Sequence, residues 1–203
     1  MKMAEFEKVK NMTYTEYCDY LQKKYGIGLA DYMTKSFYKN KKVSRTSEGL
    51  VAHHKAEDKM IQLSTKAVAQ MCLFEWQLKE NIVYCDYLEH LLLHVLICKY
   101  PSPEKNPMAD VGFGGVVNFI VPELNDVYSG WTSKQAWQLK CYDKVIDDKN
   151  VYLEILRMFI DYLRVERKCS DKSVLHTSFN EAFGGWSREH NARIYADIDQ
   201  LWN

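Results

Sequence analysis

The stretch over residues 82–96 constrains the fold of this chain more than any other part of its sequence. It opens with Ile82-Val83-Tyr84, a β-branched and aromatic run typical of a strand. Asp86 follows as a helix N-cap, and Glu89, three residues on, completes a capping box. On the helix that starts there, His90 and His94 are four residues apart and therefore share a face. A separate apolar stripe can anchor this helix in a core: Leu88, Leu91, Leu92, Val95 and Leu96.

A second pair of histidines lies upstream of this strand and helix. His53 and His54 follow the short apolar run 49–52, so we expect them at the end of another strand. Because side chains alternate along a strand, the two imidazoles should point in opposite directions. One of them can join His90 and His94 as a third metal ligand, while the other stays free to move protons and faces solvent. The module then consists of a strand, a long connection, a strand and a helix, and it holds four of the six histidines.

The order His-His, Asn81 and His-x-x-x-His resembles the HNH (ββα-metal, His-Me finger) endonuclease motif, in the version found in the DNase domains of colicins and pyocins. The resemblance covers residues 45–98. It implies that His53, His90 and His94 hold one divalent metal ion. It also implies that His54 is the general base and that Asn81 orients it by tying the loop between the strands. Where that family has a Gly-rich turn after the histidine pair, this chain has the charged segment 55–59.

The reaction that the resemblance implies is metal-dependent hydrolysis of phosphodiester bonds in DNA, which leaves 5′-phosphate and 3′-hydroxyl ends. Imidazole ligands favour zinc, nickel or manganese over a magnesium-only site, and the sequence leaves the identity of the ion open among these four. The alternative is an interaction or inhibitor protein of a phage or mobile element. Such a protein would keep the module as a metal-stabilised scaffold without turnover and bind a protein partner through its C-terminal helices.

A basic cluster precedes the histidine pair, and it has two interpretations. Lys39, Lys41, Lys42 and Arg45 lie close together in the chain, with Tyr38 beside them. Lysine and arginine neutralise phosphates and an aromatic ring can stack on a base, so the cluster can bind nucleic acid. The alternative is an ordinary solvated loop, and the sequence does not decide between the two.

We expect an α+β fold, mostly α-helical, with a small ββα-metal module embedded among helices. Three of the four prolines fall in residues 100–107 and mark a break after the module. The predicted regions, packed as one compact unit, are a helical segment with the basic stretch (1–44), the HNH module (45–100) and a helical region (108–203). Apolar periodicity predicts further helices over residues 13–25, 29–38, 116–128, 133–144, 149–167 and from 187 toward the end of the chain.

Composition limits the partners and the cellular compartment. The chain has 27 basic and 27 acidic residues, which weighs against a promiscuous DNA binder but leaves room for a local basic patch. Its six cysteines are scattered, as expected for free thiols in a reducing compartment. No signal-peptide core opens the chain, and no apolar run approaches the about 20 residues that span a bilayer. We therefore expect a cytoplasmic protein that binds no membrane, and the resemblance implies that its partner is nucleic acid, most simply DNA.

Overall fold

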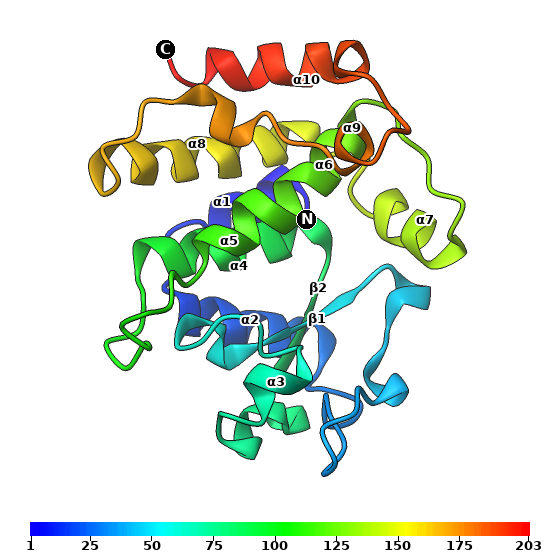
Figure 1. Cartoon of the computed structure of the whole chain (residues 1–203), viewed down its shortest axis with the longest axis vertical. Coiled ribbons are helices and arrows are strands. Elements are labelled where there is room, and N and C mark those ends of the chain that lie inside the picture. Colours follow the sequence, from blue (N-terminus) through cyan, green and yellow to red (C-terminus); the bar gives the residue numbers. More distant parts are fainter.

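The computed structural model describes all 203 residues and shows an α+β fold, mostly helical, with one two-stranded antiparallel sheet (Figure 1). The strands are β1 (Val51–His54) and β2 (Ile82–Cys85). The α-helices are α1 (Met3–Val9), α2 (Tyr14–Tyr25), α3 (Lys66–Ala69), α4 (Tyr87–Lys99), α5 (Phe113–Gly115), α6 (Val121–Tyr128), α7 (Ala136–Asp143), α8 (Lys149–Val165), α9 (Phe179–Ala182) and α10 (Arg188–Gln200). A π-helix, η6 (Val116–Ile120), joins α5 to α6.

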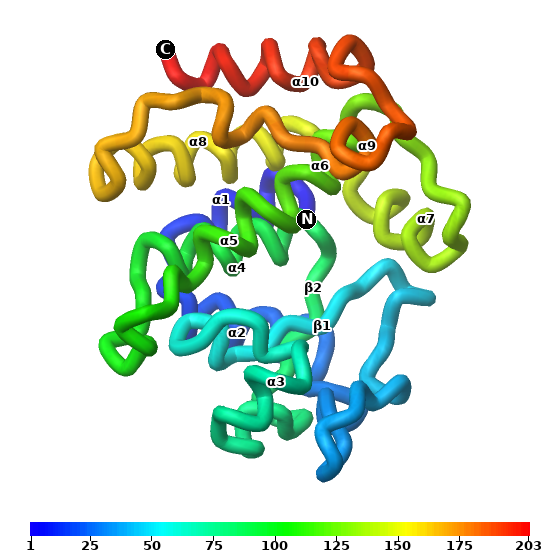
Figure 2. Tube along the Cα trace, viewed as in Figure 1, coloured from blue at the N-terminus to red at the C-terminus, as the bar shows by residue number.

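Helix α4 lies at the centre of the molecule and packs against α8, α2, η6 and both strands. Figure 1 shows the helices in tiers, from α10 through α8 to α4–α6, with α2 and the sheet beyond them. One hydrophobic core of 38 buried residues runs through these tiers, from α1 and α2 to α10. The long connection between β1 and β2 covers the end of the molecule opposite α10 (Figure 2).

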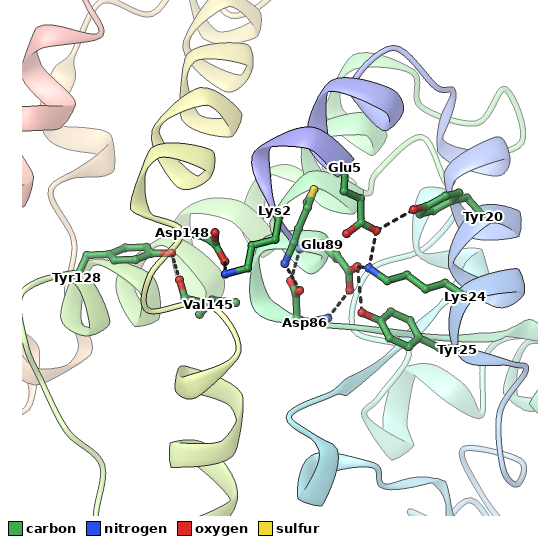
Figure 3. Close-up of polar contacts among 11 residues, drawn as sticks. Lys2, Glu5, Tyr20, Lys24, Tyr25, Asp86, Glu89, Tyr128, Val145 and Asp148 are labelled. Carbon is green, nitrogen blue, oxygen red and sulfur yellow. Dashed lines mark hydrogen bonds and ion pairs between the residues drawn. The ribbon is translucent and has the colours of Figure 1, made fainter.

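The start of α4 is held in a buried polar network (Figure 3). Asp86 and Glu89 form the predicted capping box, each accepting a hydrogen bond from the backbone N–H of the other. The Glu89 carboxylate is fully buried and also accepts hydrogen bonds from Lys24 Nζ at 2.7 Å and Tyr25 Oη at 3.2 Å. Since Lys24 also pairs with Glu5, the network ties α4 to both α2 and α1. It fixes the direction in which α4 presents its histidines.

Most of the predicted elements are confirmed, with shifts of a few residues at their ends. Residues 29–38 are the exception, because they form no helix and contain only an isolated bridge between Met33 and Lys39. Their backbone bonds to distant segments instead, for example from Leu29 N to Tyr84 Oη and from Tyr32 N to the Gln77 carbonyl. Tertiary pairing therefore overrides the local helical pattern there. The sequence analysis also did not predict α1.

Two further findings bear on the predicted compartment. All six cysteines are free, and four of them are buried. No helix combines the length and the apolar character that crossing a bilayer requires.

Candidate metal centre and active site

The sheet places the two adjacent histidines at the end of β1. His53 pairs with Val83 and His54 with Ile82, and both imidazoles are buried. The Asp86–Glu89 capping box starts α4 directly after β2. The first turns of the helix, which carry His90 and His94, therefore lie close to the sheet. The ring of His53 lies 5.2 Å from the ring of His90 and 5.1 Å from that of His94, measured between centroids.

The nitrogens of these three rings converge. One nitrogen from each of His53, His90 and His94 lies within 4.8 Å of the other two. Two nitrogens that each lie about 2.1 Å from a tetrahedral cation are about 3.4 Å apart. The His90 and His94 Nε2 atoms are 3.2 Å apart, which fits that geometry. The structure thus shows a buried histidine group that could hold a metal ion.

Protonation and hydrogen bonding fit the same conclusion. Burial lowers the pKa of His53 to about 3, and burial likewise lowers the pKa of His90 well below its usual value and that of His94. The rings are therefore neutral at pH 7, the state in which imidazole binds metals. His53 Nδ1 is buried and has no hydrogen-bond partner. Buried polar atoms are rarely left unpaired, so a cation facing this nitrogen would satisfy it.

Tyr14, on α2, sets the tautomer of His53. Its hydroxyl lies 2.8 Å from His53 Nε2, and it also reaches the carbonyls of His54 at 3.2 Å and Lys55 at 3.1 Å. When the hydroxyl proton goes to one of these carbonyls, the hydroxyl oxygen accepts from His53 Nε2–H, and this is the arrangement that a metal on Nδ1 requires. Nδ1 then keeps its lone pair and faces the other two histidines. The sequence analysis missed Tyr14, since nothing in the local pattern of α2 points to a site 39 residues further on.

Glu57 is the second residue that the sequence analysis missed. Its carboxylate lies 3.5 Å from His53 Nδ1, 3.5 Å from His94 Nε2 and 3.4 Å from His54 Nδ1. A 3-10 turn over Lys55–Asp58 brings it back over the histidine pair. Burial alone would raise the pKa of Glu57, but attraction to the protonated forms of the neighbouring imidazoles, His53 foremost, brings it well below its usual value, so the carboxylate is ionised while the rings are neutral at pH 7. An ionised carboxylate among neutral rings favours a cation beside them.

His54 is held by the connection between the strands. Its Nε2 lies 3.1 Å from Gln77 Oε1, while the amide nitrogen of Gln77 donates to the Leu63 carbonyl at 3.1 Å. The amide oxygen therefore accepts from His54 Nε2–H, and Nδ1 is the nitrogen left for proton transfer. Gln77 too was missed, because it is fully buried in a short turn far from either histidine pair in sequence.

The prediction that the fourth histidine faces solvent is wrong, since His54 is only 1 % exposed. It lines instead a cavity of about 480 Å³, together with Glu57, His90 and His94. Residues 112–115 also line this cavity. There Gly115 lies against the His94 ring so closely that a Cβ atom would come within 2.2 Å of His94 Nδ1.

The remaining predicted residues lie around this centre rather than in it. Asn81 precedes β2, and its amide donates to the Glu75 carbonyl at 2.9 Å, within the connection between the strands. The Nζ atom of Lys39 lies 5.2 Å from the centroid of the Tyr32 ring. Lys41 and Lys42 are exposed in a 3-10 turn.

Arg45 is the most constrained member of the basic cluster. Its guanidinium bonds to the carboxylate of Glu48 and to the carbonyl of Tyr25, so its charge is already paired. Its role in binding nucleic acid, like those of Lys39, Lys41 and Lys42, stays a prediction.

His176 and His190 take no part in the centre. His176 stacks on Tyr195, and His190 bonds to Ser187 at the start of α10.

The chain was compared with models of protein families, with curated proteins and with solved structures, and none of them matches it.

Proposed function

We propose that the chain is a metal-dependent endonuclease of the HNH type that hydrolyses phosphodiester bonds in DNA. One observation carries the proposal. Three imidazoles, from the buried His53 and His94 and the partly buried His90, bring one nitrogen each within 4.8 Å of the others, and a fourth, His54, lines the same cavity as His90 and His94. A structural zinc site is normally closed by four protein ligands, whereas three protein ligands leave a coordination position open for water or substrate, and hydrolysis also needs a base next to the ion.

His53, His90 and His94 would hold the ion, with Glu57 close enough to contribute an oxygen. When bound, a divalent cation supplies charge neutralisation at the scissile phosphate and stabilises the departing 3′ oxygen. Tyr14 keeps the lone pair of His53 pointed at the ion. The three neutral rings and the ionised carboxylate suit zinc, nickel or manganese.

His54 would take the proton from the attacking water through Nδ1. Gln77 holds the opposite nitrogen as an N–H, so the ring cannot turn and only Nδ1 is available. Glu57 lies 3.4 Å from Nδ1 and stabilises the imidazolium that forms when the proton arrives. An imidazole is a competent base near pH 7, and a positioned base contributes about 10²–10⁴-fold to the rate.

The test is a cleavage screen of plasmid DNA with zinc, nickel, manganese and magnesium, on the wild-type protein and on His54→Ala. The variant should lose about 10²-fold or more in rate and keep its bound metal, as measured by atomic emission. His190→Ala is the matched control, since that imidazole is exposed and far from the cavity in the fold. Absence of cleavage by the wild-type protein with every metal would reject the proposal and leave a metal-stabilised scaffold.

A further inference from the structure

The cavity beside the histidines has an unusual lining for a protein that acts on a polyanion. No lysine or arginine lines it, and its acidic groups are Glu57 and Asp110. Away from the histidines its surface is apolar and amide-bearing, with Phe113 and Phe119 as the large rings and Gln62 and Asn118 as the amides. Apart from an ion held by the histidines, nothing in this lining offsets the charge of a phosphate, so the cavity can take the scissile phosphate but not a run of backbone phosphates. Aromatic faces and amides are instead what holds a nucleobase, by stacking and by hydrogen bonds to its edge.

A basic groove adjoins this cavity on the side of β1. Its cations are Lys39 and Arg45. Glu48 pairs the charge of Arg45, so Lys39 supplies the excess positive charge. The groove shares Tyr32 and Ala52 with the cavity. Tyr32 lies where the basic groove meets the cavity. Its ring contacts the Lys39 ammonium group, and its centroid lies 4.3 Å from that of the His54 ring. A strand could therefore keep its flanking phosphates on the basic side and turn one base into the cavity while its scissile phosphate reaches the histidines.

Phe119 is the residue best placed to stack on that base. Its side chain is 60 % exposed although it lines the cavity, so the fold leaves its ring without a full set of partners. It lies in the π-helix η6, directly before α6. Pro122 explains the wide turn, because its ring clashes with the carbonyl four residues back and it has no N–H to bond there. The π-helix places Asn118 and Phe119 together on the cavity side, and π-helical turns often mark functional sites.

We propose that this cavity binds an unpaired nucleobase next to the scissile phosphate, so that the protein cuts single-stranded rather than fully paired DNA. The inference rests on the proposed function and names its substrate class. A volume of about 480 Å³ suits one small organic group. His54 and His94 are recessed in it, at 1 % and 7 % exposure, so the phosphate must come down into the cavity to reach them. A base in a duplex must first leave its stack, whereas an unpaired base has no such penalty.

The test uses a fluorescein-labelled DNA hairpin with a paired stem and an unpaired loop. Wild-type protein loaded with its active metal should cut in the loop at least about tenfold faster than in the stem, because unstacking a paired base costs a few kcal/mol. Phe119→Ala should lower the cleavage efficiency of the loop by about 5- to 150-fold, the effect of losing one base–aromatic stack. Tyr100→Ala is the control, since this exposed aromatic lies outside both the cavity and the basic groove. Equal rates in stem and loop would overturn the inference.

A binding measurement separates this inference from the proposed function. Fluorescence anisotropy with the labelled loop sequence as a single strand, on a His54→Ala background, should show about 5- to 150-fold weaker binding when Phe119→Ala is added. No weakening relative to the added Tyr100→Ala overturns the base site even where the protein cuts DNA. Weakening without any cleavage by the wild type supports the base site and rejects the nuclease.

Discussion

The close contact between Gly115 and His94 gives the sharpest prediction of the structure. In Gly115→Ala the new Cβ atom would lie 2.2 Å from His94 Nδ1 and 2.4 Å from Cε1. Ordinary contact begins at 3.4 Å, so the ring would have to move by about 1.2 Å, and a ligand tolerates about 0.2 Å. The substitution should therefore remove His94 from the metal site. Loss of even a supporting hydrogen bond costs 10–100-fold in metal affinity, so we expect a loss of more than about 100-fold, or about 2.7 kcal/mol.

The neighbouring glycine provides a matched control in the same short helix. In Gly114→Ala the Cβ atom would meet only the side-chain amide of Asn118, at 3.5 Å, which is an ordinary contact. An alanine is also better than a glycine inside a helix, by about 0.5–1 kcal/mol. Gly114→Ala should bind metal like the wild type and unfold at the same or a slightly higher temperature.

The assay is a competition titration of zinc between each protein and a chromogenic chelator, with circular dichroism to show that both variants are folded. The wild type and Gly114→Ala should give the same dissociation constant. If folded Gly115→Ala also binds zinc as tightly as Gly114→Ala, then His94 is not a ligand or its ring is free to move aside, and the reasoning fails.

Three further predictions concern the groups around the histidines. Tyr14→Phe removes the hydroxyl that accepts from His53 Nε2–H, and metal affinity should fall by about 10- to 100-fold in the chelator titration; an unchanged affinity would contradict the assigned tautomer. Gln77→Leu leaves the Leu63 carbonyl and His54 Nε2 without their partner, so urea unfolding should show a loss of about 1–3 kcal/mol, and kcat should fall while metal content stays the same. A wild-type kcat would show that the ring needs no anchor. The metal-free protein should be most stable above pH 6.5, because the pKa of His53 falls from 6.5 to about 3 on folding and the unfolded chain binds more protons in between. Lowering the pH from 6.5 to 5 should remove about 2 kcal/mol through this residue alone, and equal urea midpoints at the two values would refute it.

Strands β1 and β2 and helix α4 could be predicted because each carries its own local sequence signal. The capping box of Asp86 and Glu89 fixes where the helix starts, and a four-residue spacing places His90 and His94 on one face whatever the rest of the chain does. The helix predicted over residues 29–38 failed for the opposite reason. Its backbone bonds to β2 and to the connection, and no local pattern can reveal partners so far away in sequence.

The residues that surround His54 differ in how well the sequence could reveal them. Glu57 had a signal, since it lies three residues after His54 and a helical turn at that point brings it back over the ring. That signal was obscured because an acidic residue in a charged segment is normally solvated. Gln77 had none, because its contact with His54 depends on how the whole connection folds back.

The connection between β1 and β2 therefore does more than join two strands. Strand β1 and helix α4 supply the three histidine nitrogens that converge. The connection supplies Glu57, Gln77 and the Leu63 carbonyl that orients Gln77. The three converging imidazoles and the partners of the fourth thus come from separate stretches of the chain, and Glu57 is the one residue that contacts both groups. Changes in the connection outside Glu57 would then alter the surroundings of His54 and leave the three converging imidazoles in place.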